Sequence, residues 1–446
     1  MAVAHAPKGG PLIETEAEKK IYSKVNWHIL PLLLVAYVFA FIDRVNIGFA
    51  QLQMKTDLHL SDAVFALGAG LFFVGYFLFE VPSNLALEKI GARKTILRIM
   101  ICWGACATAM AWVNAPWQFY VLRFLLGAFE AGFFPGVILY FTFWYPTARR
   151  GRAIAIFMTA TALAGVLVGP LNGALMKYGE GFLGYHGWQW MFIANGVPCL
   201  IIAVLVFFML VDSPAEAKWL TAEEKKILID RVEGEKTSTG GHGHGAMRTL
   251  LKDPKVFILA LTYFLMSAAV YALLFWAPTL IRSWGVADVF QIGMLKAVAS
   301  VCGIIGMVLI GRSSDRLNDR RWHFAFAISC IVAGLGLIAM LAPSLGPSLA
   351  LYSLATVGTS AATPLFFAFV SEYLSKETAA GGIALISSLG NLGPAISPSI
   401  STWILTTTGE AKYSLLFIIS LYILAAIIMV AVARKRTPAG VVPQPA

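Results

Sequence analysis

The sequence has 446 residues, of which 58% are hydrophobic and only 13% are charged, and its mean hydropathy is +0.74. Soluble domains contain about 25% charged residues, so this composition excludes a soluble protein and indicates an integral membrane protein. The formal net charge of +10 is no sign of nucleic-acid binding, because the placement of the basic residues reflects membrane topology, as shown below.

Twelve apolar runs are each long enough to cross a bilayer, which takes about 20 residues. They lie at residues 27–50, 62–86, 94–113, 117–141, 152–176, 188–211, 256–281, 290–311, 322–342, 348–371, 379–405 and 413–433. A polar segment separates six runs from six. The sequence therefore predicts an all-α membrane protein with a tail (1–26), a six-helix bundle (27–211), a linker (212–254), a second six-helix bundle (255–433) and a C-terminal tail (434–446).

Lysine and arginine are distributed unevenly between the predicted loops. The loops on one side carry only Lys55, Lys177, Arg282 and Lys412. Inside the spans lie Arg44, Arg123 and Lys296, and the rest of the 34 basic residues lie on the other side. Cytoplasmic loops carry the excess of Lys and Arg. We therefore predict a multi-pass protein of the cell's inner (plasma) membrane with both termini in the cytoplasm; the polar N-terminus lacks the features of a cleaved signal peptide.

The linker is expected to contain a short amphipathic helix on the cytoplasmic surface. Its apolar residues recur at helical spacing: Trp219, Leu220, Ile227, Leu228 and Val232. The stretch GGHGHG (240–245) is interpreted as a flexible linker rather than a weak metal site. The five cysteines all lie in apolar runs, so we expect neither disulfides nor a metal site, and no cofactor.

Two charged residues in succession, Asp43 and Arg44, interrupt the first span. A charge near the bilayer centre costs about 2.5–3.5 kcal/mol on insertion scales. Neighbours on a helix point about 100° apart, so these two side chains pair poorly with each other. Each needs another partner, and a ligand or water in a cavity would serve.

Arg123 in the fourth span lies at a similar depth. Arg44 is roughly 21 Å from the inner edge, and Arg123, on a helix of opposite direction, is roughly 9 Å from the outer edge, at 1.5 Å per residue. In a hydrocarbon core of about 30 Å these depths coincide, and Glu130 lies two turns beyond Arg123 on the same face. Two guanidinium forks would suit an organic anion, and Asp43 and Glu130 could carry protons across the membrane.

Other candidates have weaker support, because packing explains each of them equally well. Tyr76 in the second span, Asn391 in the eleventh and Trp276 in the seventh are further candidates for binding substrate, and Tyr271 has less support. Lys296 lies near the outer end of the eighth span, so we expect its ammonium group to extend towards the outer surface.

The two halves repeat each other. NLALEKIGARK (84–94) follows the second span and GRSSDRLNDRR (311–321) follows the eighth; each has an acid–base pair followed by a basic pair. Repeated six-span halves are typical of rocker-type transporters, with the site between the halves. We predict that charges on these loops form contacts between the halves and act as a cytoplasmic gate: Glu88, Arg93, Asp315, Arg316 and Arg320. Glu80 and Glu372 are expected to assist this gate.

The doubled loop resembles the signature loop of the major facilitator superfamily, although Asn84 stands where glycine is usual and Glu88 where aspartate is usual. Four further segments together resemble the anion:cation symporter family, most closely bacterial permeases for tartrate, phthalate and hydroxyphenylacetate. These segments are FIDRVNIGFA (41–50), LFFVGYFLFEVPSNLALEKIGARK (71–94), YVLRFLLGAFEAGFFPGVILY (120–140) and GGIALISSLGNLGPAISPSI (381–400).

This resemblance implies that Asp43 and Glu130 take part in protonation and that Arg44 and Arg123 take part in substrate binding. We therefore predict a transporter and not an enzyme. It would import a small organic carboxylate, either a tartrate-like hydroxy acid or an aromatic carboxylate, together with protons by alternating access. Its partners would be this anion, protons and the lipid bilayer, without nucleic acid, and we expect a monomer.

Two alternatives remain open. GVLVGPLNGA (165–174) also resembles a fifth-helix motif of drug:proton antiporters, although Gly and Pro serve helix packing and bending as well. A membrane sensor without transport is the less favoured alternative, because it would need an output domain and the 212–254 linker is too short to be one.

Overall fold

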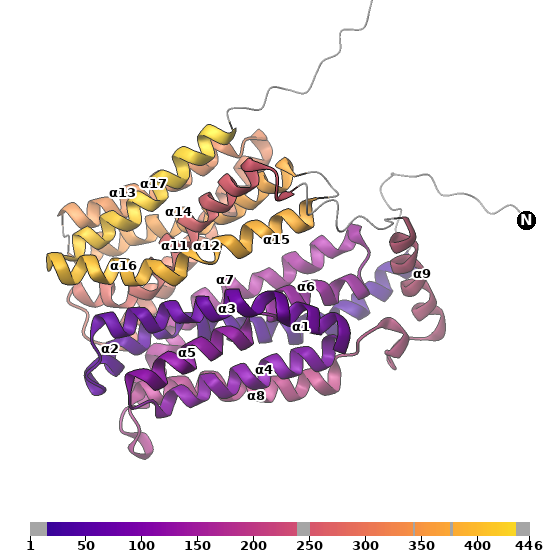
Figure 1. Ribbon diagram of the computed structural model, residues 1–446, viewed down its shortest axis with the longest axis horizontal. Helices are drawn as coiled ribbons and strands as arrows, with labels where there is room; N and C mark the ends of the chain where they lie inside the picture. The colour runs from indigo at the N-terminus through magenta and orange to yellow at the C-terminus, as the bar shows by residue number, and fades with distance from the viewer. Residues whose placement is uncertain (1–15, 239–249, 342–343, 375–377, 434–446) are drawn as a thin grey trace, which may run out of the picture.

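The computed structural model describes residues 16–238, 250–341, 344–374 and 378–433. The GGHGHG stretch (240–245) and the predicted C-terminal tail lie outside these ranges. Within them, twelve helical spans are long and apolar enough to cross a membrane, which confirms the number predicted from the sequence. The helices form two bundles that lie side by side, one built from α1–α8 and the other from α11–α17 (Figure 1).

The first bundle consists of α1 (Glu16–Val45), α2 (Ile47–Asp57), α3 (Asp62–Ile90), α4 (Ala92–Ala109), α5 (Pro116–Glu130), α6 (Phe133–Trp144), α7 (Thr147–Tyr178) and α8 (Gly187–Met209). The short 3-10 helices are η1 (Met110–Trp112), η2 (Phe182–Gly184) and η3 (Pro214–Glu216). The second bundle consists of α11 (Pro254–Ser283), α12 (Val289–Leu317), α13 (Arg321–Leu341), α14 (Leu345–Tyr373), α15 (Ala379–Gly390), α16 (Gly393–Thr408) and α17 (Ala411–Ala433).

Three spans are interrupted helices. The first is divided at Asn46 between α1 and α2, the fourth between α5 and α6, and the eleventh between α15 and α16. Proline explains the last two interruptions, since Pro135 and Pro394 lack the N–H that would bond to the carbonyl four residues earlier. In the eleventh span that carbonyl belongs to Gly390, and it accepts a hydrogen bond from Ser267 Oγ of α11 at 2.5 Å instead. A neighbouring helix thus satisfies the free backbone group.

The helix expected in the linker is α9 (Ala222–Ser238), and it packs against α1. Arg231 pairs with Glu18 at 2.6 Å and Lys24 pairs with Glu224 at 3.0 Å. These contacts explain why α1 begins at Glu16, well before the apolar run predicted at residue 27. Hydrogen bonds from Thr221 N and then Lys24 lower the pKa of Glu224. We call the end of the molecule that carries α9 the α9 end, and the end that carries α2 the α2 end (Figure 1).

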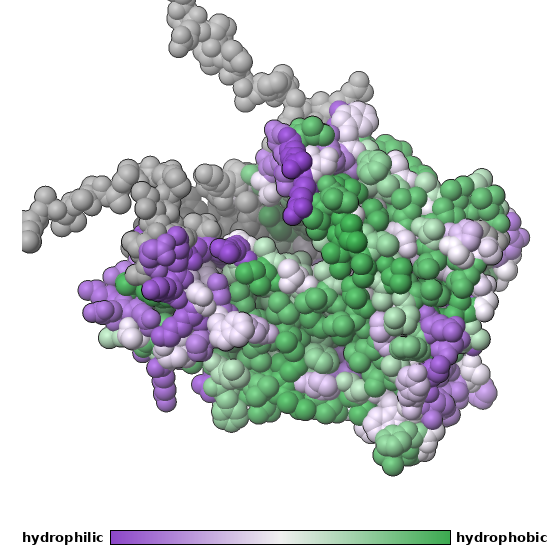
Figure 2. Space-filling model, turned by 180° about the vertical axis from the view of Figure 1, so that it is seen from behind, coloured by the Kyte–Doolittle hydropathy of each residue, from purple (hydrophilic) through white to green (hydrophobic). Residues whose placement is uncertain are grey.

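The surface matches a protein embedded in a bilayer. Figure 2 shows a broad hydrophobic surface between two ends at which hydrophilic residues gather, with the polar cluster around α9 at one of them. A helix satisfies its own backbone hydrogen bonds, so it is one of the few structures that can face lipid.

The halves touch closely where α7 meets α12. A Cβ atom added to Gly169 of α7 would lie 2.2 Å from the carbonyl oxygen of Gly293 on α12. A Cβ atom added to Gly293 would lie 2.1 Å from the carbonyl oxygen of Gly169. Small residues allow this backbone approach, as they do at other membrane helix interfaces.

We predict that Gly169→Ala lowers the thermal unfolding midpoint of the detergent-purified protein, because overpacking a close contact costs about 1–3 kcal/mol. Gly151→Ala on the same helix is the matched control, since its added Cβ would meet no atom within 4 Å. Equal midpoints for the two variants would show that α7 and α12 are not in this contact in the purified protein.

Candidate functional site

Arg44 bridges the two bundles near the end of α1. Its Nε donates a hydrogen bond to Glu130 Oε1 at 3.1 Å, and its Nη2 forms an ion pair with the same oxygen. Its Nη1 donates to the hydroxyl of Tyr271 on α11 at 3.3 Å. The Arg44 side chain is 15% exposed and that of Glu130 only 1%. The arginine therefore holds a carboxylate of the first bundle and a phenol of the second in a largely dry site.

Arg123 lies beside Arg44, as their positions along the helices predicted. Both guanidinium groups lie over the ring of Phe72, at 5.6 Å for Arg44 and 5.0 Å for Arg123 from the ring centroid. Arg123 is 1% exposed, and its Nε donates to the carbonyl oxygen of Gly68 at 3.2 Å. The π face of a ring attracts cations, which helps two like charges to share this small volume.

Two polar atoms of this cluster have no partner. Arg123 Nη2 and Glu130 Oε2 are buried without a hydrogen bond in the part of the chain that the structure describes. Buried polar groups are normally paired, so one free donor and one free acceptor mark a place where a ligand, a proton or water can bind. An anion can bind at Arg123 Nη2, and a proton can bind at Glu130 Oε2.

Asp43 points into the first bundle, away from this cluster. It is fully buried, and its Oδ2 accepts hydrogen bonds from Trp103 Nε1 of α4 at 2.7 Å and from Cys199 Sγ of α8 at 3.5 Å. Its Oδ1 accepts from Asn46 Nδ2 at 3.3 Å. Its partners are neutral donors, and the structure shows no ion pair between Asp43 and an arginine among the described residues.

Aromatic rings form the wall next to Arg44. Tyr76 is 5% exposed, and the Arg44 guanidinium lies 5.1 Å from its ring centroid. From the second bundle, Tyr271 packs edge-on against Phe73, with ring centroids 4.7 Å apart. Tyr76 and Tyr271 are therefore both at the site, although the sequence supported Tyr271 only weakly.

Two other candidates do not reach this cluster. Trp276 lines a separate cavity of about 170 Å³ near the α2 end, together with Lys55 and Asp62. Asn391 lies at the interruption between α15 and α16, and its side chain makes no hydrogen bond to another described residue. Their assignment to substrate binding stays a prediction.

The expectation for Lys296 is wrong. Its side chain does not extend to the outer surface: the residue is only 4% exposed and lines a cavity between the two bundles. Its position near the end of an apolar run predicted a lysine that reaches water. The neighbouring helices α7 and α14, which are distant in sequence, enclose it instead.

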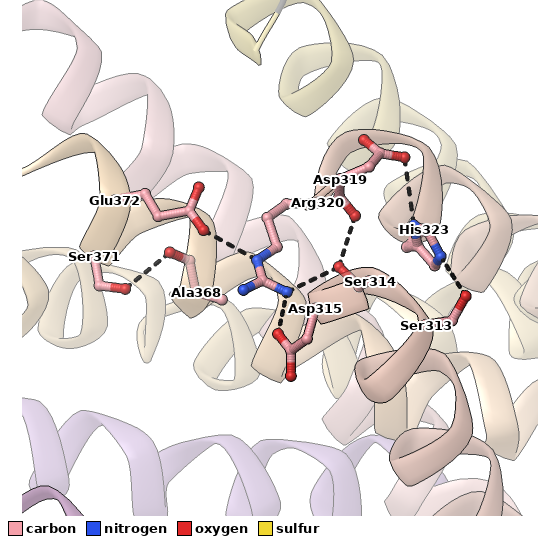
Figure 3. Close-up of polar contacts among 9 residues, drawn as sticks. All are labelled: Ser313, Ser314, Asp315, Asp319, Arg320, His323, Ala368, Ser371 and Glu372. Atoms are coloured by element: carbon pink, nitrogen blue, oxygen red, sulfur yellow. Dashed lines mark hydrogen bonds and ion pairs between the residues drawn. The ribbon is translucent and has the colours of Figure 1, made fainter. Parts of the chain in front are cut away.

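The residues predicted to form the gate make contacts within their own halves. The backbone N of Arg93 donates to Asp212 at 2.8 Å, and its side-chain Nε donates to the carbonyl oxygen of Phe207 on α8. Asp315 accepts from Arg320 Nη1 at 2.5 Å, and Arg320 Nε donates to Glu372 at 3.0 Å (Figure 3). These acids, Asp315 first, raise the pKa of Arg320.

Two further residues do not test the predicted gate. Arg316 has no hydrogen bond or ion pair within the described ranges, and the side chain of Glu88 is not among the described parts of the structure. The gate between the halves therefore stays a prediction. One hydrogen bond does join the halves near the α9 end, from Ser388 Oγ to Glu80 Oε2 at 3.1 Å.

Polar contacts join the halves at the α2 end. Lys177 at the end of α7 pairs with Asp288, and this hydrogen bond is the main cause of the lowered pKa of Asp288. Arg282 Nη1 donates to the carbonyl oxygen of Leu52 at 2.9 Å. Gln51 Nε2 donates to the carbonyl oxygen of Phe275 at 2.6 Å.

Phe72 and Trp103 were not predicted from the sequence to lie at the site. Both are aromatic residues in apolar runs, and nothing in the local pattern distinguishes a ring that faces a charge from a ring that faces lipid. The charged residues themselves were the available signal: a buried carboxylate such as Asp43 requires donors, and Trp103 is one of them.

Comparisons with known proteins give the family. The Major Facilitator Superfamily model matches residues 33–352 and 326–446. A protein of Agrobacterium vitis described as a candidate tartrate transporter is 44% identical over 95% of this chain and 94% of its own length. A quinolone resistance transporter of Acinetobacter baumannii is 41% identical over 85% of this chain and 87% of its own.

One solved structure supports the same fold. It is a bacterial homologue of the human lysosomal transporter Spinster in an inward-facing, unoccupied conformation, with a TM-score of 0.76 over 94% of this chain and all of that one. At 19% identity this likeness shows the fold alone.

We predict that Arg44→Lys strongly reduces binding of an anionic substrate while leaving the amount of folded protein unchanged. Lysine keeps the charge but loses the planar fork that now reaches Glu130 and Tyr271 together. Radiolabelled uptake into cells and surface expression are measured side by side, with Arg152→Lys as the control because that arginine is exposed on α7 and has no hydrogen bond or ion pair among the described residues. Undiminished uptake by Arg44→Lys would exclude Arg44 as the anion anchor.

Proposed function

The chain belongs to the Major Facilitator Superfamily and is a transporter of a small molecule, and we propose that it is a symporter of an organic carboxylate and protons. One observation carries the proposal: the Arg44 guanidinium, between the two bundles, is held by a carboxylate of the protein itself. A substrate carboxylate offers the same chemistry as Glu130 and can replace it on Arg44. The unpaired Nη2 of Arg123 offers a second donor nearby.

Coupling follows from competition for Arg44. While Glu130 is ionised, it occupies the guanidinium through Oε1. When a proton binds the free Oε2 of Glu130, the carboxyl group loses its charge and the ion pair weakens. Arg44 is then available to a substrate carboxylate, so proton and anion favour each other's binding, which is positive linkage. Loss of the proton restores the ion pair and releases the anion.

We assign Asp43 to the same proton pathway in a supporting role. Its carboxylate lies one residue from Arg44 but is bonded to Trp103 and Cys199 inside the first bundle. A change in its charge acts on the packing of α1 against α4 and α8, rather than on the substrate directly. This assignment distinguishes it from Glu130, which shares Arg44 with the substrate.

The proposed orientation has the α9 end in the cytoplasm, supported by the distribution of Lys and Arg. The contacts of Lys177, Arg282 and Gln51 then close the outer side of the protein, which corresponds to a conformation that faces inward. In the opposite conformation we propose that the loops carrying Glu88, Arg93, Asp315, Arg316 and Arg320 meet across the halves. In the inward-facing conformation, Arg93 and Arg320 would stay bound to their partners within their own halves.

The proposed substrate class is a small carboxylate, and the similarity to a candidate tartrate transporter supports a hydroxy acid. The second candidate function is drug:proton antiport, which the similarity to a quinolone resistance transporter favours. Uptake of labelled tartrate into proteoliposomes, set against efflux of a quinolone from the same vesicles, separates the two. Proton-driven quinolone efflux without any carboxylate uptake would replace the proposal.

We predict that Glu130→Gln separates binding from coupling. Glutamine resembles the protonated carboxyl group, so the variant should bind substrate with a weaker dependence on pH, whereas wild-type affinity increases as the pH falls. Accumulation driven by a proton gradient should be lost, and exchange of internal for external substrate should survive. If Glu130→Gln still concentrates substrate with normal proton movement, Glu130 does not couple transport to protons.

We predict that Asp288→Asn opens the α2 end more often. Asparagine keeps the hydrogen bonds by which Asp288 Oδ1 caps α12, at 2.8 Å to Phe290 N and 3.1 Å to Gln291 N, but loses the charge that pairs with Lys177. A reporter Thr402→Cys in the cavity at that end should react faster with a membrane-impermeant maleimide. An unchanged labelling rate would show that the ion pair does not hold this end closed.

A further inference from the structure

Lys296 is a buried cation that the proposed mechanism does not use. It lies on α12, one turn beyond Gly293, where α7 and α12 are in close contact. The residue is 4% exposed, and its Nζ lies 5.5 Å from the ring centroid of Phe49. Charged residues inside membrane spans are rare and normally paired, and they mark substrate or ion pathways.

No carboxylate of the described residues pairs with this ammonium group. Lys296 makes no ion pair, and its Nζ makes no hydrogen bond, in the part of the chain that the structure describes. Arg44, by contrast, forms an ion pair with Glu130. The ring of Phe49 offsets only part of the cost, because a cation–π contact contributes about 2 kcal/mol when it is desolvated and burial of an ion costs several. An anionic group of a bound ligand would supply the missing negative charge.

The cavity that Lys296 lines has a volume of about 200 Å³, and its walls combine apolar side chains with hydroxyl groups. Hydroxyl groups from both bundles border it: Thr161, Ser300, Thr356, Thr359, Ser360 and Thr363. Four of them donate to carbonyl groups of their own helices and keep lone pairs free. The hydroxyls of Ser360 and Thr363 have no hydrogen bond to another described residue, so each can donate to an anion or to a hydroxyl of a ligand.

This cavity borders the Arg44 cluster. It is lined by Phe41, one turn before Arg44 on α1, and by Val270 and Leu274 on either side of Tyr271 on α11. Arg44 donates to the hydroxyl of that same Tyr271. A ligand that extends from Arg44 past Tyr271 towards these lining residues would enter the cavity of Lys296.

We propose that Lys296 binds a second anionic group of the substrate, so that the transported molecule is a short dicarboxylate, with hydroxyl groups on the carbons between. This inference rests on the proposed function, since it takes Arg44 as the anchor of the first carboxylate. The dicarboxylate joins α1 and α5 of one bundle to α12 of the other. A molecule with one carboxylate reaches Arg44 but leaves the Lys296 charge uncompensated.

The test compares tartrate with tartaric acid monoamide, which has the same shape and one charge less. Binding to the purified full chain is measured by isothermal titration calorimetry at a pH where both tartrate carboxylates are ionised. Wild type should bind tartrate at least about tenfold more tightly than the monoamide, because hydrogen bonds to charged groups are stronger than those to neutral groups. Lys296→Met should lower tartrate affinity to that of the monoamide and leave monoamide affinity unchanged.

The controls separate charge from packing. Lys296→Arg keeps a cation and should retain preference for tartrate, and Lys412→Met, a surface lysine on α17, should behave as wild type. If Lys296→Met does not fold, Lys296→Gln takes its place, and the wild-type ratio of the two affinities tests the inference without any variant.

Three results would overturn the inference while the proposed function stands. These are equal wild-type affinities for the two ligands, an equal loss of affinity for both ligands in Lys296→Met, or unchanged tartrate binding in Lys296→Met. In the last of these cases, a loss of proton-driven accumulation in the variant would show that Lys296 carries the proton instead. If wild type binds neither ligand nor any other carboxylate tested, the proposed function fails and this inference fails with it.

Discussion

The ion pair between Arg44 and Glu130 is the interaction on which the rest of the site depends. Removing two charges from water costs several kcal/mol per ion, and mutual attraction repays this only with good geometry and further hydrogen bonds. The pair has both, since Arg44 contacts Glu130 through two nitrogen atoms and donates to Tyr271 with the third. Because Tyr271 belongs to the second bundle, anything that displaces Glu130 also changes a contact between the bundles.

Interrupted helices bring these groups to the middle of the molecule. Arg44 is the next-to-last residue of α1, and Glu130 is the last residue of α5, immediately before its interruption. An interruption leaves backbone groups without helical partners, which membrane proteins tolerate only where protein or a cavity satisfies them. The bond from Ser267 to the Gly390 carbonyl does this in the eleventh span. The same breaks that weaken the helices thus allow bending next to the charges.

The two ends of the molecule are held together by different means. At the α2 end, Lys177, Arg282 and Gln51 all contact the opposite half. At the α9 end, Arg93 and Arg320 contact their own halves, and Glu80 with Ser388 provides a bridge. Two bundles that are joined more firmly at the α2 end, near which Gly169 also meets Gly293, can separate more readily at the α9 end. Arg44 and Lys296 lie between those ends.

Apolar length, local motifs and the constant rise of a helix were enough to predict the twelve spans, the family and the similar depth of Arg44 and Arg123. The face that each side chain presents, and the residues that cover it, became known from the folded arrangement of the helices. Asp43 bonds to Trp103 and Cys199 on two other helices, and Lys296 is enclosed by helices far away in sequence, as no local pattern indicated. The physical reason is that helix rotation and pairing are set by packing between distant residues, whereas span length and depth are properties of one helix alone.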